Sequence, residues 1–299
     1  MNRPFLLALS ISAALAAGCQ TVETTKSGAV GVERPQRMAV SSEEVNAGSE
    51  KAYAQMMAQA QQKGVLDKDA AAVARVKTVV GRLIPQTAVF RDDAAKWPWE
   101  AHVITLDEVN AWCMPHGKMA IYTGLITKLQ ATDDELAAVM GHEISHALRE
   151  HSREQISREM GTQAAIGIAG ALLGVGQLGQ NVAGMVANVT LELPKSRAAE
   201  TEADRMGVEL AARAGYNPQA AITLWQKMEK LGGSQPPKWL STHPPHADRI
   251  AELQEVIAKV QPLYQAALQN PPPSAAAGGS APSSAAQNLD RPRRARRAR

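Results

Sequence analysis

The sequence predicts an α+β fold that is mainly helical, with a small β-sheet beside one central helix. Apolar residues make up 45% of the chain but aromatic residues only 4%, so alanine and small aliphatic side chains must fill the core, which favours helices. Apolar residues recur at helical spacing through much of the chain, whereas only two short stretches have the character of strands. The 299 residues suffice for one large domain or two modest ones.

Two helices are expected before the sheet, near residues 43–62 and 67–84. The second carries valine and leucine side chains at helical spacing, and Asp67 is its expected N-cap. Pro85 should end it, because proline removes a backbone donor and disrupts a helix interior. These helices would open a domain that we place at residues 43–268.

The sheet is expected from "AHVITL" at 101–106 and "KMAIYT" at 118–123, with a turn at "MPHG" between them. A capped helix should follow at once. Thr132 and Glu135 form the Thr-x-x-Glu pattern of a capping box, in which each side chain accepts a hydrogen bond from the backbone of the other residue. The sheet and this helix would therefore be neighbours in the chain.

In the second half of the domain the sequence predicts only helices. Residues 161–191 carry no charge, and their glycines and apolar runs favour a helical hairpin or flap. Further helices are expected at about 195–213, 217–231 and 246–268.

Both ends of the chain differ from this domain. Residues 1–18 have an early positive charge and a short apolar run, as in a secretory signal peptide of the lipoprotein type. The ending "LAAGC" resembles a lipobox and predicts lipidation of Cys19, with an ordinary cleaved signal as the alternative. Gln20 after the cysteine favours an outer-membrane lipoprotein in the periplasm, and the fallback is a soluble periplasmic protein. Residues 19–42 would be a flexible tether.

Residues 269–299 are expected to be a disordered tail, because alanine, proline, serine and glycine dominate them. The last nine residues, "RPRRARRAR", hold six arginines. Without the signal and the tail the chain has 25 basic and 28 acidic side chains, so its body is mildly acidic. No nucleic-acid partner is therefore expected.

Chemistry concentrates in "HEISH", residues 142–146, on the capped helix. His142 and His146 are four residues apart and share one helix face, so both imidazoles can bind one zinc ion per chain. Glu143 lies one residue round the helix, where it can act as the general base that activates a zinc-bound water. A solvated helix with two chance histidines is the alternative.

A catalytic zinc site needs a third protein ligand. His151 is a poor candidate, because nine residues of continuous helix turn it about half a turn away from His142; we expect a surface histidine. "AAETEADRMG" at 198–207 is better, since Glu200 and Asp204 share a helix face. One carboxylate can bind the metal while the other accepts a hydrogen bond from a ligand histidine. Glu202 should face elsewhere.

The motifs resemble those of the gluzincin metallopeptidases that include the HtpX-, BepA- and LoiP-like proteins, the CAAX prenyl proteases and the mitochondrial Oma protease. The resemblance spans about residues 40–260. It is carried in order by four segments: "NAWCMPHGKMAIYTGL" at 110–125, the HEISH helix, "SRAAETEAD" at 196–204 and "STHPPHADRI" at 241–250.

The resemblance implies a zincin-like fold, zinc ligands at His142, His146 and Glu200, Glu143 as general base, and Asp204 supporting a ligand. The first segment would supply the strand that binds an extended peptide substrate, which we place at Lys118, Met119, Ala120, Ile121 and Tyr122. His243 would lie near the cleft and either approach the zinc or stabilise the oxyanion, with a loop histidine in a structural bond as the alternative. Arg197 and Arg249 would form structural ion pairs.

The leading hypothesis is a zinc-dependent endopeptidase of the bacterial envelope that cuts misfolded or stalled envelope proteins, held at the membrane by its N-terminal lipid. The resemblance supplies this substrate class. Two alternatives stay open: a chaperone-like binding module of the same fold that does not cut, and a zinc hydrolase of a non-protein amide. The 161–191 segment and the "STHPPH" loop are the candidate gates, because glycines permit hinge motion.

Overall fold

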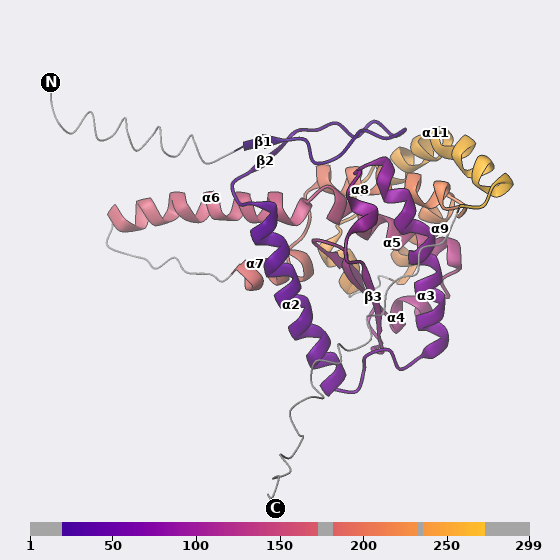
Figure 1. The fold of residues 1–299 in the computed structure, drawn as a ribbon, viewed down its shortest axis with the longest axis horizontal. Coiled ribbons are helices and arrows are strands. Elements are labelled where there is room, and N and C mark those ends of the chain that lie inside the picture. Colours follow the sequence, from indigo (N-terminus) through magenta and orange to yellow (C-terminus); the bar gives the residue numbers. More distant parts are fainter. Residues whose placement is uncertain (1–19, 173–181, 232–235, 273–299) are drawn as a thin grey trace, which may run out of the picture.

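A computed structural model describes residues 20–172, 182–231 and 236–272, and it confirms a mainly helical fold with a small sheet (Figure 1). The elements in chain order are β1 (Gln20–Val22), β2 (Gln36–Met38), α2 (Ser42–Gln62), α3 (Ala70–Leu83), the 3₁₀ helices η1 (Ile84–Val89) and η2 (Ala94–Lys96), β3 (Glu100–Ile104), β4 (Ala111–Met114), β5 (Lys118–Tyr122), α4 (Thr123–Lys128), α5 (Asp133–Leu148), α6 (His151–Leu172), α7 (Val182–Leu191), α8 (Arg197–Arg213), α9 (Ala220–Leu231), α10 (Lys238–Thr242) and α11 (Arg249–Gln269).

The main sheet has the strand order β3-β5-β4, with β5 parallel to β3 and antiparallel to β4. The prediction that Lys118–Tyr122 is the substrate-binding strand is therefore wrong, because β5 is the central strand and both of its edges are already paired. Among the described residues β3 and β4 are the two edge strands, and the outer side of β3 already carries a bridge from Ile104 to Leu66, so β4 is the strand that a peptide could extend. The sequence did not reveal β4, because all four of its residues are buried and show no alternation.

Helix α5 is the central element of the domain. Its N-terminus has the expected capping box, with Thr132 Oγ1 accepting from the Glu135 amide at 3.2 Å and the Glu135 carboxylate accepting from the Thr132 amide at 2.8 Å. Every residue from Glu135 to Leu148 is buried. Such a helix lies inside the core and is covered on all sides by other elements. Its polar residues consequently need partners within the protein.

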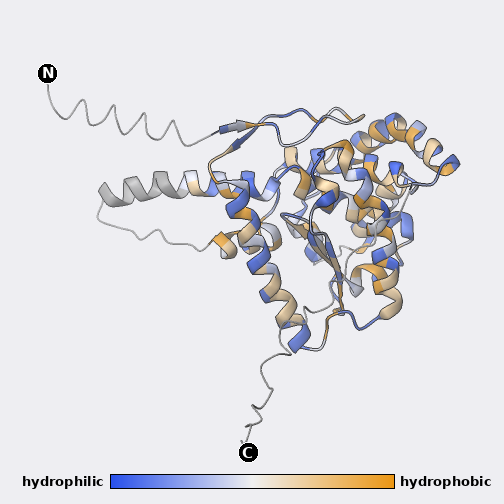
Figure 2. Ribbon diagram, viewed as in Figure 1, coloured by the Kyte–Doolittle hydropathy of each residue, from blue (hydrophilic) through white to orange (hydrophobic). Residues whose placement is uncertain are grey.

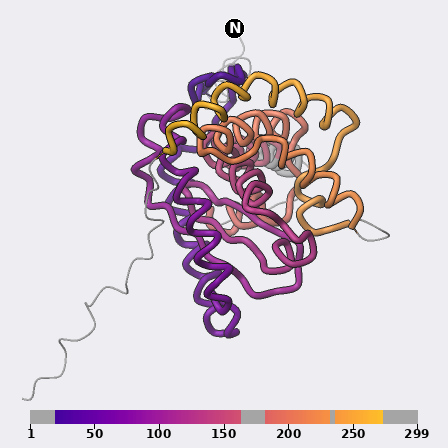
Figure 3. The backbone as a smooth tube through the Cα atoms, turned by 90° about the vertical axis from the view of Figure 1, so that its right-hand side faces the viewer, coloured from indigo at the N-terminus to yellow at the C-terminus, as the bar shows by residue number. Residues whose placement is uncertain are grey.

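Helix α8 packs against α5 at very short range. A Cβ atom on Gly207 would lie 2.7 Å from the backbone nitrogen of His142, and one on Gly141 would lie 2.8 Å from the carbonyl oxygen of Gly207. Two glycines facing each other therefore let the two helix backbones touch. Helix α11 packs in turn across α8 and α9 (Figure 3). This arrangement places the acidic half of α8 beside the HEISH motif.

The flexible tether expected at residues 19–42 is not what the structure shows for its described part. Residues 20–38 contain the two-stranded sheet of β1 and β2, and Val30, Val32 and Met38 are buried. The Glu209 carboxylate on α8 accepts hydrogen bonds from the Ala29 and Val30 amides at 2.9 and 3.1 Å. A few apolar side chains and paired polar groups thus dock the segment, and they are too sparse to form a periodic pattern in the sequence.

Two helix starts also differ from expectation. Helix α3 is capped by Asp69, whereas Asp67 instead accepts hydrogen bonds from the Val103 amide and His102. Helix α6 begins at His151, directly after a corner in which Glu150 has a φ of 51°.

Hydrophilic and hydrophobic residues both occur along the outer helices, as on α2 (Figure 2). In the described part of the chain, no helix combines the length and apolar character needed to cross a membrane.

The expected signal peptide at residues 1–18, the predicted lipidation site Cys19 and the basic end of the tail lie outside the described residues, as does the middle of the 161–191 segment.

We predict that Gly207→Ala lowers the free energy of unfolding by about 1–3 kcal/mol, because the added methyl group overpacks the contact with α5. Gly184→Ala is the matched control. Gly184 is an exposed helical glycine with open space around it, so alanine there should stabilise the helix by up to about 1 kcal/mol. Urea unfolding followed by circular dichroism measures both. Equal stabilities of the two variants would contradict the close contact.

Candidate metal centre

Four buried side chains from three parts of the chain converge beside α5. His142 and His146 come from α5, Glu200 from α8, and His243 follows α10. One potential ligand atom from each lies within 4.8 Å of those of the others. The structure therefore brings together the three predicted ligands and adds His243 to them.

The contacts among these atoms fit a bound cation. His146 Nε2 lies 3.0 Å from His142 Nε2 and 3.4 Å from Glu200 Oε1. Within the described residues, Glu200 Oε1 and His243 Nε2 are buried without a hydrogen-bond partner. Buried polar atoms are normally satisfied, and one metal ion would satisfy both of these. Imidazole nitrogens with one carboxylate oxygen are the kind of donor set that zinc accepts.

Both α5 histidines are held through their Nδ1 atoms. His142 Nδ1 lies 2.9 Å from Asp204 Oδ1, and a carboxylate can only accept, so Nδ1 carries a proton and Nε2 is the ring nitrogen that faces the other donors. Asp204 thus lies in the supporting position that the resemblance implies for it. His146 Nδ1 lies 2.8 Å from His151 Nδ1, and His151 Nε2 lies 3.0 Å from the Glu202 carboxylate.

The prediction that His151 is a surface histidine is wrong. Its side chain is buried, and it lies between His146 and Glu202. The prediction assumed one continuous helix, whereas α5 ends at Leu148 and the chain turns at Glu150 before α6 begins. Glu202 does face away from the metal ligands as expected, but it contacts one of them through His151.

Arg249 holds the two acidic residues of the site. Its Nη1 donates to Glu200 Oε2 at 3.0 Å and its Nη2 to Asp204 Oδ1 at 2.7 Å. The guanidinium stacks 3.5 Å above the ring of Trp225. Arg249 therefore forms the structural ion pairs that the resemblance implied. Arg197 pairs instead with Asp248 at the surface, at 2.8 Å.

Glu143 lies beside the four donors without belonging to them. Its Oε1 accepts a hydrogen bond from Trp239 Nε1 at 2.7 Å and lies 3.4 Å from His243 Nε2. Burial raises the pKa of Glu143 to about 7, although His142 and the bond from Trp239 act in the opposite direction. A carboxylate with a pKa near neutrality is suited to accept and return a proton. Trp239 was not singled out in the sequence, where it carries no motif of its own.

His243 presents a lone pair to the cluster. Its Nδ1 lies 3.1 Å from the carbonyl oxygen of Trp239, which only accepts, so Nδ1 carries the proton. Burial lowers the pKa of His243 well below its usual value and keeps the ring neutral. A neutral ring with the proton on Nδ1 cannot donate from Nε2. Of the two roles considered for His243, this geometry favours approach to a metal over stabilisation of an oxyanion.

Lys195 is a further buried group that sequence reasoning missed. Its ammonium donates to the Val189 carbonyl at 2.6 Å, at the C-terminal end of α7, and its amide donates to the Thr242 carbonyl at 2.9 Å. Burial lowers the pKa of Lys195 to about 8, against the opposing effect of Glu143 and Glu200. Lys195 thus ties the end of α7 to the segment that carries His243.

Comparison with known proteins agrees with this site. The profile of Peptidase family M48 matches residues 70–257, which include all four converging side chains. Metalloprotease YcaL of Escherichia coli is 26% identical over 261 residues, covering 86% of this chain and 98% of that protein. Metalloprotease LoiP of Escherichia coli is 26% identical over 255 residues, covering 85% and 96%.

A third relative is the mitochondrial metalloendopeptidase OMA1 of Bos taurus, 34% identical over 224 residues that cover 70% of this chain and 42% of that protein. The chain thus spans less than half the length of the OMA1 relative. The profile match covers well over half of the chain and contains the complete donor cluster with Glu143. The chain therefore belongs to peptidase family M48.

Proposed function

We propose that this protein is a zinc-dependent endopeptidase in which Glu143 is the general base. The observation that carries the proposal is the buried cluster of His142, His146, Glu200 and His243 with Glu143 directly beside it. Membership of a peptidase family supports it, as do the metalloprotease names of its relatives.

Each residue has a role that follows from its contacts. His142, His146 and Glu200 would hold the ion, and Asp204 with Arg249 fixes the orientation of His142 and Glu200. Zinc at this position would polarise the substrate carbonyl and lower the pKa of a water molecule. Glu143 Oε1 would accept the proton of the attacking water and deliver it to the leaving amine.

We further propose that the segment with His243 gates the site. A catalytic zinc keeps one position open, whereas four protein donors would close a tetrahedral site. His243 follows the short helix α10, and it is held there by its bond to Trp239 rather than by a rigid long helix. Withdrawal of this segment would open the position that water and substrate need. This agrees with the sequence-based expectation that the "STHPPH" loop is a gate.

The proposed substrate is a polypeptide in extended conformation, which could pair with the free edge of β4. We propose envelope proteins that are misfolded or stalled as the physiological substrates. The signal-like N-terminus with Cys19 and the resemblance to envelope metallopeptidases support this proposal, together with attachment to the outer membrane through a lipid.

Glu143→Gln is expected to lower kcat by about 10²–10⁴-fold, because glutamine cannot accept the water proton. Zinc content should stay at one ion per chain, since Glu143 is not among the four donors. In the test, the purified full chain is incubated with an unfolded outer-membrane protein. The cleavage fragments and the zinc content of the chain are then measured. Glu255→Gln, at an exposed position of α11, is the control. Equal cleavage by wild type and Glu143→Gln would refute the mechanism, and binding without cleavage by both would support the binding module instead.

Loss of a group that only supports a metal ligand typically weakens metal binding by about 10–100-fold. Glu200→Gln is expected to weaken zinc binding by more than this, because it changes a ligand itself. The amide keeps a hydrogen-bond acceptor for Arg249 but loses the negative charge. Competition with a chromophoric chelator measures the zinc affinity of the variant, and Glu255→Gln is again the control. An unchanged zinc affinity would show that Glu200 is not a ligand.

His243→Ala is expected to keep zinc bound, because three donors remain, and to raise kcat at saturating substrate by a few fold. The reason is that His243 no longer competes for the fourth position. Zinc content and steady-state kinetics are measured on the same sample. A fall in kcat of about 10²-fold or more would instead assign His243 a direct role in stabilising the transition state.

A further inference from the structure

We infer that residues 20–40, the N-terminal segment, form a clamp on the metal centre: through Glu202 and His151 they fix the orientation of His146. Metal binding and docking of this segment would then be thermodynamically coupled. The inference rests on the proposed metal site but not on proteolysis. It follows from a continuous set of hydrogen bonds that leads from the ligand to the segment.

The inner part of this set joins His146 to Glu202. Glu202 only accepts, so the 3.0 Å contact places a proton on His151 Nε2. A neutral His151 then has its lone pair on Nδ1, where it accepts from His146 Nδ1 at 2.8 Å. His146 is left with its own lone pair on Nε2, facing the other donors. Removal of His151 would leave a buried N–H without an acceptor and would free the His146 ring to rotate.

The outer part joins Glu202 to the N-terminal segment. Arg34 Nε donates to Glu202 Oε1 at 2.6 Å, and Arg34 also forms a two-pronged pair with Glu154 on α6 at 2.6 and 2.9 Å. Arg149 Nε donates to the other oxygen, Glu202 Oε2, at 2.9 Å. Burial alone would raise the pKa of Glu202, but the bonds from His151 and Arg34 outweigh it and lower the pKa to about 2. The carboxylate is therefore charged and held from both sides.

The same segment also holds the corner between α5 and α6. Arg149 Nη2 donates to the Arg34 carbonyl at 2.7 Å, and the side-chain amide of Gln36 donates to the Arg149 carbonyl at 2.8 Å. Gln36 is fully buried, with 0% of its surface exposed, so its bonds are shielded from water. Thr24 adds a contact with the Arg149 guanidinium at 3.2 Å. His151 directly follows this corner, two residues after Arg149, and depends on it for its position.

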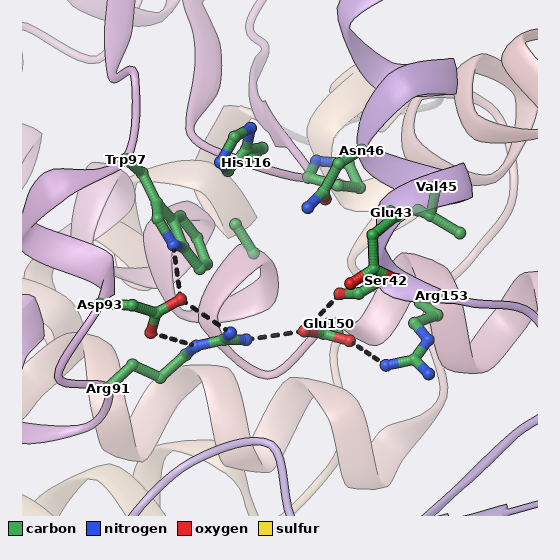
Figure 4. A pocket seen from close by; sticks show the side chains of 12 residues that line it. Ser42, Glu43, Val45, Asn46, Arg91, Asp93, Trp97, His116, Glu150 and Arg153 are labelled. Carbon is green, nitrogen blue, oxygen red and sulfur yellow. Dashed lines mark hydrogen bonds and ion pairs between the residues drawn. The ribbon is translucent and has the colours of Figure 1, made fainter.

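The opposite side of the corner is fixed as well. Glu150 accepts from Arg91 at 2.7 Å, from Arg153 at 2.6 Å and from Ser42 at 2.9 Å, and these groups line a pocket of about 170 Å³ (Figure 4). The corner is thus anchored on both sides, by the N-terminal segment and by charged groups of the body. Loss of the Arg34 side chain would remove the direct bonds from the segment to Glu202, whereas the indirect link through Arg149 and the Glu150 side would stay intact.

Coupling of this kind is reciprocal. If docking of the segment raises the metal affinity by some factor, metal binding must favour docking by the same factor. Loss of a group that supports a metal-ligating histidine typically costs about 10–100-fold in metal affinity. We therefore expect the segment to be more protected in the zinc-loaded chain than in the metal-free chain, and this protection to require His151.

The first experiment measures zinc affinity of the full chain by chelator competition. Arg34→Gln and His151→Phe should each weaken binding by about 10–100-fold. Lys26→Ala is the matched control, because Lys26 lies in the same segment but forms an exposed ion pair with Asp92, at 2.5 Å, away from the site. It should bind zinc like the wild type. Zinc affinities of Arg34→Gln and His151→Phe within twofold of wild type would overturn the inference.

The second experiment separates coupling from a general loss of stability. Hydrogen exchange of residues 20–40 is compared with and without zinc, with α11 as the internal reference. In the wild type, zinc should slow exchange in the segment, at most by the factor by which zinc binding weakens when the segment is undocked. In His151→Phe the zinc effect on the segment should vanish although the segment still docks. Equal zinc protection in wild type and His151→Phe would overturn the inference, whereas a wild type that binds no zinc would refute the metal site itself.

Discussion

The contact between the backbones of α5 and α8 is the constraint on which the site depends. Gly141 and Gly207 face each other where an added Cβ atom would lie only 2.8 and 2.7 Å from the facing backbone, and this contact sets the distance between the two helices. His142 follows Gly141 directly, and Glu200 lies seven residues before Gly207, so the same contact brings both ligands together. With bulkier residues the helices would separate, and a carboxylate on α8 could no longer reach the imidazoles on α5. The geometry of the donors is thus a consequence of helix packing.

Helix α8 uses its acidic residues on two different faces. Glu200 and Asp204 face the donor cluster and are held by Arg249, whereas Glu202 and Glu209, seven residues apart, bind the N-terminal segment. All four are buried or nearly so, and a buried carboxylate is stable only when charged or hydrogen-bonded partners surround it. One helix therefore connects the metal centre with the segment that precedes the whole domain.

The sequence predicted those parts of the molecule that depend on local pattern. The capping box at Thr132, the two α5 histidines and the carboxylates on α8 follow from spacings of three and four residues within one helix. His151 and β4 could not be found in this way. The position of His151 depends on a helix break at Glu150, where the sequence has no glycine or proline to indicate a break. Strand β4 is buried on both faces and therefore has no alternation of polar and apolar residues. The docking of residues 20–40 rests on single long-range pairs such as Arg34 with Glu202, which leave no periodic signal.

Trp239 joins the two functions that the proposed mechanism must coordinate. Its indole N–H donates to Glu143, and its carbonyl oxygen accepts from His243. A displacement of α10 would therefore release the base and withdraw the fourth donor in one step. Burial raises the pKa of Glu143 and the bond from Trp239 lowers it, so the displacement would remove two opposing effects on that pKa at once. A closed site, with four donors and Glu143 bonded to Trp239, and an open site, with three donors and Glu143 released, would then be the two states of one element, the short helix α10.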